Sequence, residues 1–112
     1  MKGYKMNYEQ ALTKFLVELT KREKRHINDN YTNLTPARFA VVFGRKFDKV
    51  LKISNSSTVF AFIKKNNGAI LKPASWKSPE PKQYERGNIF NDDPLEGTGV
   101  YGVDYLNVGV IK

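Results

Sequence analysis

The segment from Lys72 to Phe90 is the part of the sequence richest in residues able to do chemistry. Within it, cationic and aromatic side chains are interleaved, in the order Lys72, Trp76, Lys77, Lys82, Tyr84 and Arg86. Proteins that bind single-stranded nucleic acid use this combination, because Lys and Arg meet phosphates and rings stack on bases for about 1 to 3 kcal/mol each. We therefore predict that Trp76, Lys77, Tyr84 and Arg86 belong to a nucleic-acid-binding site.

A structural role is the alternative interpretation of this segment. A tryptophan in a proline-rich loop often covers the open end of a sheet, and Arg86 could bridge carbonyl groups of the loop. The two interpretations predict opposite exposures for the Trp76 ring. It lies on the surface if the segment binds a ligand, and it is buried if the segment is scaffold.

Residues for catalysis are few. The sequence has no cysteine and one histidine, His26, so thiolate nucleophiles and zinc sites built on sulfur are excluded. No spacing links His26 to a serine nucleophile, and triads are recognised by geometry. A small ribonuclease that uses His26 with Glu18 or Arg22 is the one catalytic hypothesis left, and we expect no catalytic residues.

Metal and cofactor motifs are also lacking. The acids Asp92, Asp93, Glu96 and Asp104 do not have the alternating spacing and fixed glycine of a calcium-binding loop. Glu80-Pro81-Lys82 superficially matches the end of a metal-dependent nuclease site, but its prolines oppose the strand that such a site needs. Gly97-Thr98-Gly99 is too short to cradle a phosphate. We expect no metal and no cofactor.

The net charge of +8 is unevenly distributed. Residues 1–65 contain 14 Lys or Arg against 5 Asp or Glu, whereas residues 66–112 contain 5 against 6. The positive field of the first half attracts polyanions such as nucleic acid or an acidic protein surface. The residues that we predict to contact phosphates there are Lys21, Arg22, Lys24, Arg25, Arg45, Lys46, Lys49 and Lys52.

An amphipathic helix is predicted over residues 8–26. Asn7 and Gln10 have the spacing of a capping box, and apolar residues then recur at helical spacing from Tyr8 to Leu19. The basic cluster of residues 21–25 would lie at the negative end of the helix dipole. The polar segment 28–36 reads as a loop.

Antiparallel strands are predicted after this loop. Apolar residues alternate over 38–43 and 47–53, and β-branched and aromatic residues fill 58–64. Asn67-Gly68 predicts a type I′ hairpin turn into a fourth strand, 69–72, which Pro73 ends. Residues 73–99 form a long loop, which Trp76 and Ile89 among other apolar residues should order, and the tail over 100–111 forms a short strand or a turn and a strand.

The sequence thus predicts one α+β domain over residues 1–112, in which the helix packs on an antiparallel meander of four to five strands. No apolar run approaches the roughly 20 residues that cross a bilayer, and the N-terminus lacks a signal peptide. We expect a soluble protein that does not enter a membrane.

The same segment carries a family resemblance. Lys72-Pro73-Ala74-Ser75-Trp76-Lys77-Ser78-Pro79 followed by Arg86-Gly87-Asn88-Ile89 resembles a stretch found in short proteins of uncharacterised role encoded by tailed bacteriophages. The resemblance implies a phage source and a place in the host cytoplasm or the virion, and it implies no catalytic residues.

Two hypotheses follow. The first is a non-enzymatic protein that binds nucleic acid, DNA or RNA, single-stranded or duplex. The second is a phage protein that docks its basic half on an acidic surface of a host or virion protein.

Overall fold

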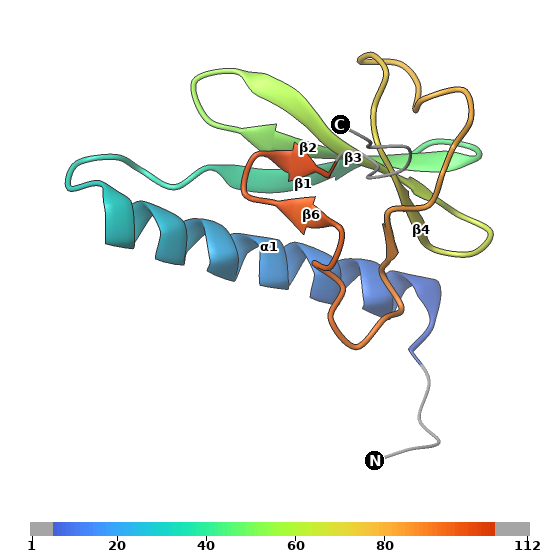
Figure 1. Ribbon diagram of the computed structural model, residues 1–112, viewed down its shortest axis with the longest axis horizontal. Coiled ribbons are helices and arrows are strands. Elements are labelled where there is room, and N and C mark those ends of the chain that lie inside the picture. Colours follow the sequence, from blue (N-terminus) through green and yellow to red (C-terminus); the bar gives the residue numbers. More distant parts are fainter. Residues whose placement is uncertain (1–5, 105–112) are drawn as a thin grey trace, which may run out of the picture.

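The computed structural model describes residues 6–104, which form one helix and two sheets (Figure 1). The helix, α1, covers Tyr8–Asn30. The strands are β1 (Arg38–Val42), β2 (Phe47–Ile53), β3 (Ser57–Lys64), β4 (Ala69–Leu71), β5 (Gly87–Asn88), β6 (Thr98–Gly99) and β7 (Gly102–Val103). The predicted α+β fold is confirmed. No helix within residues 6–104 combines the length and the apolarity needed to cross a membrane.

Helix α1 begins where the sequence predicted and ends later. Asn7 accepts a hydrogen bond from the Gln10 backbone N–H, and the Gln10 side chain accepts one from the Asn7 N–H, which completes the capping box. The predicted end at residue 26 is wrong, because buried Ile27 adds another turn to the apolar face and accepts the Tyr31 N–H. The basic cluster therefore lies before the last turn, which contains no Lys or Arg.

The main sheet has the order β1-β2-β3-β4-β5, with every neighbouring pair antiparallel. Helix α1 covers one face of it. The core between them contains Phe15 and Leu19 from the helix and Val50, Ile63 and Ile70 from the strands. We refer to the opposite side as the outer face of the sheet. The register of the paired strands determines which residues belong to each face.

Strand β3 contains a β-bulge on the side of the sheet that faces the helix. Val50 pairs with Ala61 and its neighbour Leu51 pairs with Val59, so Phe60 is the extra residue. Phe60 and Ala61 are both buried in the core on the helix side, where the Phe60 ring meets the Phe39 ring edge-on at 5.5 Å. The bulge adds a large aromatic side chain to the core of a small domain.

The turn between β3 and β4 differs from the prediction. A type I′ turn requires positive φ at two residues, but Gly68 alone has it here, at +80°. The Gly68 N–H donates to the Lys64 carbonyl at 2.7 Å, so the connection is a longer loop that ends in a left-handed glycine. The type I′ prediction is wrong, because Asn67 instead accepts a bond from the Ala69 N–H through its side chain.

The prediction of one long irregular loop over residues 73–99 is wrong, because this range contains short strands. Gly87–Asn88 pairs with β4 as the fifth strand, and Thr98–Gly99 forms a small hairpin with Gly102–Val103. Two-residue strands leave no periodic pattern in a sequence. The final strand predicted over 100–111 is represented by β7, and residues 105–112 lie outside the described range.

Candidate functional site

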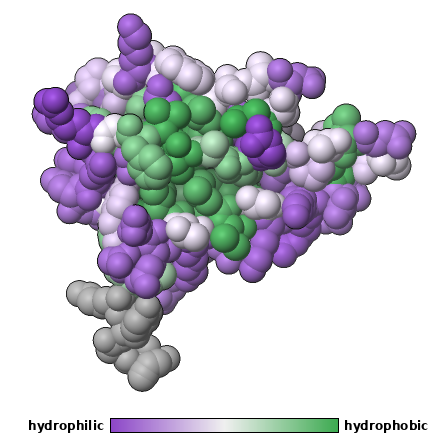
Figure 2. Space-filling model, turned by 180° about the vertical axis from the view of Figure 1, so that it is seen from behind, coloured by the Kyte–Doolittle hydropathy of each residue, from purple (hydrophilic) through white to green (hydrophobic). Residues whose placement is uncertain are grey.

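The outer face of the sheet is largely apolar, with one cation at each end and one, Lys49, among the apolar residues of its middle. Register assigns to this face a set of apolar residues and three cations, and none of its positions in β1 to β5 is Asp or Glu. The apolar residues are Ala40, Val42, Phe47, Leu51, Ile53, Val59, Phe62, Ala69 and Leu71, and the cations are Arg38, Lys49 and Lys64. Figure 2 shows the resulting apolar patch bordered by hydrophilic residues.

A tight turn brings Trp76 to this face. In the segment that we call the Trp76 loop, residues 72–80, Pro73 and Pro79 form a β-bridge and the Glu80 N–H donates to the Lys72 carbonyl. Trp76 is 49% exposed, and Lys49 Nζ lies 4.4 Å from the centroid of its ring. The cation–π contact is of a kind worth about 0.5 to 1 kcal/mol at exposed sites, and it holds a half-exposed ring beside a cation of the outer face.

The part of the outer face near β4 is covered by protein. Phe62, Ala69 and Leu71 are buried there in a second, smaller core, against which Phe47 and Val59 pack. Exposed apolar surface remains over β1 and β2, where Val42 is half-exposed and Ala40 partly so. Of the two exposures predicted for the Trp76 ring, the structure shows the one expected of a ligand-binding segment, since the ring is 49% exposed.

Arg86 holds together the segment between the Trp76 loop and β5. Its Nη1 donates to the Tyr84 carbonyl at 3.1 Å, its Nη2 donates to Glu80 Oε1 at 3.0 Å, and its side chain is 5% exposed. These contacts match the structural interpretation of Arg86, which bridges a loop carbonyl and a carboxylate. Arg86 therefore positions the loop, while Lys77 and Tyr84 are exposed on it.

A pocket of about 510 Å³ opens where two hairpin turns meet at one end of the sheet. We call it the turn pocket. It is lined by Arg45 and Lys46 before β2, by Phe47, by Lys64 and Lys65 at the end of β3, and by the amides Asn66 and Gln83. Four of its seven residues are cations and none is an acid, so the pocket is suited to an anion.

Asp48, which is buried on the helix side of the sheet, connects the residues at this end of the sheet. Its Oδ1 accepts the Gly44 N–H at 3.0 Å and lies 3.6 Å from Lys65 Nζ, and its Oδ2 accepts the Tyr8 hydroxyl at 2.8 Å. Lys65 Nζ also donates to the Gly44 carbonyl at 2.9 Å. Burial, together with the hydrogen bond and the charge of Asp48, raises the pKa of Tyr8 above its ordinary range. The carboxylate thereby fastens both turns to helix α1.

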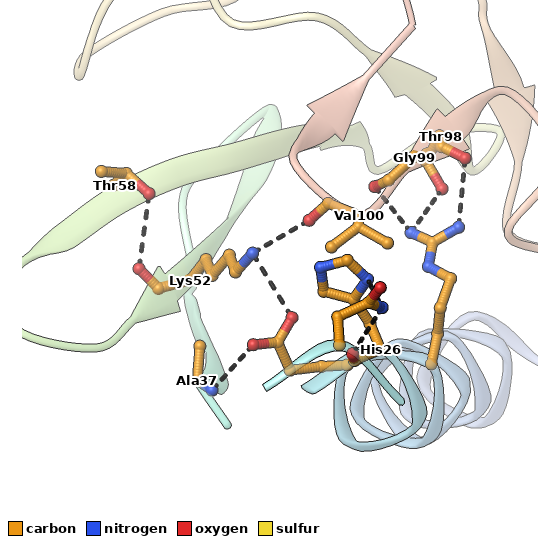
Figure 3. Close-up of polar contacts among 10 residues, drawn as sticks. His26, Ala37, Lys52, Thr58, Thr98, Gly99 and Val100 are labelled. Carbon is orange, nitrogen blue, oxygen red and sulfur yellow. Dashed lines mark hydrogen bonds and ion pairs between the residues drawn. The ribbon is translucent and has the colours of Figure 1, made fainter. Parts of the chain in front are cut away.

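Two predicted phosphate contacts lie on the other side of the sheet and are used internally (Figure 3). The Arg22 guanidinium donates to the Thr98 carbonyl and hydroxyl and to the Gly99 carbonyl at 2.9 to 3.1 Å. Lys52 Nζ donates to the Val100 carbonyl at 2.9 Å and lies 3.4 Å from Glu23 Oε1. Burial lowers the pKa of Arg22. The negative charges of nearby acids, of which Asp104 has the largest effect, partly oppose this change by raising the pKa. Both side chains attach the β6–β7 hairpin to the domain.

The remaining predicted contacts fall into two groups. Lys21, Lys24 and Arg25 are exposed on α1, on the opposite side of the sheet from the Trp76 ring, and Lys21 pairs with Glu18 at 3.7 Å. The outer-face group is Arg45, Lys46, Lys49, Trp76 and Lys77. Tyr84 is exposed on the segment between the Trp76 loop and β5. The structure therefore does not combine the helix cluster and the aromatic segment into one surface.

Sequence reasoning missed three cations of this site, Arg38, Lys64 and Lys65. For Arg38 and Lys64 the alternation of side chains between the two faces of a strand does indicate a shared face. Lys64 pairs with Phe47 and Arg38 pairs with Ile53, so both cations lie on the same face as these apolar residues. What the sequence did not show is which of the two faces the helix covers.

Among the described residues, His26 contacts an amide and two aromatic rings. Its Nδ1 lies 3.3 Å from the Asn30 amide, and its ring meets the rings of Tyr31 and Tyr101 edge-on. The Arg22 guanidinium, its hypothetical partner, is held by the β6 carbonyl groups. Within residues 6–104, no three acidic or histidine side chains gather in a way that could hold a metal ion.

These features define a class: a small α+β domain in which one helix covers one face of an antiparallel sheet and the other face is largely apolar with interspersed cations. The chain belongs to DUF7717, a family of unknown function, whose model matches residues 1–102. Comparisons with curated proteins and with solved structures gave no significant match.

Proposed function

We propose that this protein binds single-stranded nucleic acid through the outer face of its sheet. The observation that carries the proposal is the half-exposed Trp76 ring, which lies beside Lys49 on a face whose strand positions contain no carboxylate. Stacking of a base on an exposed ring is tolerant of sequence and is strengthened by adjacent cations. The ring supplies the stacking surface and the surrounding lysines supply the contacts to phosphate.

The distribution of charge supports a polyanionic ligand. Arg38, Lys49 and Lys64 project from three different strands of this face, and Arg45 and Lys46 lie at its end. The one acid in the main sheet, Asp48, is buried on the helix side. A nucleic-acid strand that crosses this face therefore meets several cations, and no residue of β1 to β5 on this face is a carboxylate that would repel it.

The shape of the face favours a single strand over a duplex. The grooves of a duplex admit a protruding helix or a two-stranded ribbon, whereas this surface is an open sheet with a ring at one side. Unpaired bases can lie flat against such a surface, as they do on the sheets of single-strand-binding modules.

The test is fluorescence anisotropy of labelled single-stranded and duplex oligonucleotides at low and near-physiological salt. Trp76→Leu keeps apolar bulk but removes the stacking ring, so we expect it to weaken single-strand binding about 5- to 100-fold. Tyr101→Leu is the matched control, since Tyr101 is 81% exposed and lies near Lys52 on the helix side. Equal binding by wild-type protein and Trp76→Leu would refute the proposal.

A protein partner is the second candidate. Val42, an aliphatic residue on this face of β1, is 48% exposed, and exposed aliphatic surface suits a protein partner better than it suits bases. In the phage setting that the segment around Trp76 suggests, the partner would be an acidic host or virion protein in the host cytoplasm or the particle. A pull-down from nuclease-treated host lysate that recovers one acidic protein, lost in Val42→Glu, would favour this function.

A further inference from the structure

The turn pocket is a concave cationic site that the stacking surface does not itself require. It joins residues from two hairpins that are about 20 positions apart in the sequence, and its volume of about 510 Å³ is within the range of about 300 to 1,000 Å³ that is common for small ligands. We infer that the turn pocket binds a phosphate group, and that the proposed nucleic-acid strand is its source.

The pocket is built before any ligand arrives. The Lys65 N–H donates to the Lys46 carbonyl at 3.0 Å, which ties one turn to the other. Lys65 Nζ is held between Asp48 and the Gly44 carbonyl. The two turns are thus fixed relative to each other, and a ligand does not have to order them.

The electrostatics of the pocket point to an anion of more than one charge. Arg45, Lys46, Lys64 and Lys65 line one cavity. Asp48, which is fully buried, lies 3.6 Å from Lys65 Nζ and neutralises part of that charge. Like charges held together repel each other, and an oxyanion between them relieves this repulsion. Asn66 and Gln83 add amide donors that can complete the coordination of phosphate oxygens.

The position of the pocket connects it to Trp76. Phe47 lines the pocket and Lys49, which contacts the Trp76 ring, is two residues further along β2 on the same face. Two strand residues span about 7 Å. A strand stacked on Trp76 can therefore place a phosphate in the pocket without leaving the outer face.

The inference rests on the proposed function for the source of the phosphate, but its test does not. The probe is inorganic pyrophosphate, titrated into isotope-labelled protein at low salt while backbone amide signals are followed by NMR. We expect saturable shifts concentrated at residues 44–47 and 64–66. Shifts of equal size at the exposed helix cluster, residues 21–25, would overturn the inference, because they would show only general attraction to positive charge.

A pair of charge-matched variants decides specificity. Arg45 and Lys46 are exposed, so Arg45→Gln with Lys46→Gln should fold normally and should weaken pyrophosphate binding about tenfold or more. Lys24→Gln with Arg25→Gln removes the same charge from α1 and should change it less than about twofold. Equal weakening by both double variants would overturn the inference.

A parallel titration with oligothymidylate separates the two proposals. If oligothymidylate fails to bind while pyrophosphate shifts the pocket amides, the proposed function fails and the phosphate site stands. If oligothymidylate perturbs Trp76 and leaves the pocket amides in place, the proposed function stands and the strand is refuted as the source of the phosphate.

Discussion

Replacement of Asp48 by asparagine tests the network that holds the turn pocket to the helix. In the wild-type protein this fully buried carboxylate accepts hydrogen bonds from the Gly44 N–H and the Tyr8 hydroxyl, and it lies 3.6 Å from the Lys65 ammonium. Asparagine keeps one acceptor oxygen, but its NH₂ group replaces the other and faces one of the two donors, the Gly44 N–H or the Tyr8 hydroxyl, so one hydrogen bond is lost. One hydrogen bond to a charged acceptor is worth about 1.5 to 3 kcal/mol.

The Lys65 contribution is smaller than that of a fully buried pair, because its side chain is 38% exposed. We therefore expect Asp48→Asn to lower the free energy of unfolding by about 3 kcal/mol, from a total of about 5 to 15 kcal/mol for a domain of this kind. This corresponds to a fall in Tm of about 10 to 20 °C.

The assay is urea and thermal unfolding followed by circular dichroism, with Asp92→Asn as the control. Asp92 lies exposed in the loop before β6, so its replacement should change stability by less than about 0.5 kcal/mol. If Asp48→Asn unfolds within about 0.5 kcal/mol of the wild-type protein, the argument that this carboxylate fastens the two turns is refuted.

Three further predictions, the second with its own control substitution, test separate parts of the fold. The raised pKa of Tyr8 means that the folded state holds its proton more tightly than the unfolded state, so its contribution is present below about pH 10 and is lost as the pH rises further; Tyr8→Phe should show a smaller alkaline loss of stability in denaturant titrations. Gly97 has a φ of +88°, and a Cβ there would overlap a neighbouring backbone carbonyl, so Gly97→Ala should cost about 3 kcal/mol or more in chemical unfolding, whereas Gly99→Ala, which meets only ordinary contacts, should cost less than about 1 kcal/mol. Arg22→Gln should leave α1 folded but increase amide hydrogen exchange in the β6–β7 hairpin at least tenfold, and unchanged exchange there would contradict the role assigned to its guanidinium.

Much of the fold follows from local signals in the sequence. The capping box of Asn7 and Gln10 defines the start of α1, and alternation of apolar residues indicates β1 and β2. β-Branched and aromatic residues indicate β3, and the Asn67-Gly68 turn signal places β4 after it. The misplaced parts depend on contacts that no local pattern reports. β5 exists because two residues after a long connection return to β4, and the last turn of α1 depends on the burial of Ile27.

The candidate site was harder to predict than the fold, because charge in a sequence does not reveal its partners. Arg22 and Lys52 read as exposed cations, yet their partners Thr98 and Val100 are 76 and 48 residues away. Lys64 was overlooked because alternation shows that two faces exist but not which one the helix covers. Sequence reasoning did select Trp76, and the structure adds that Lys49 lies beside its ring.

Tryptophan fluorescence tests the central claim most directly, because Trp76 is the one tryptophan of the chain and lies in the proposed site. Titration with oligothymidylate at low salt should quench its emission saturably. Added salt should reverse the quenching, with an affinity that falls about as the third power of salt concentration if about four phosphates are contacted. Emission that does not change at micromolar protein and saturating oligonucleotide would contradict the assignment of the outer face as a nucleic-acid-binding surface.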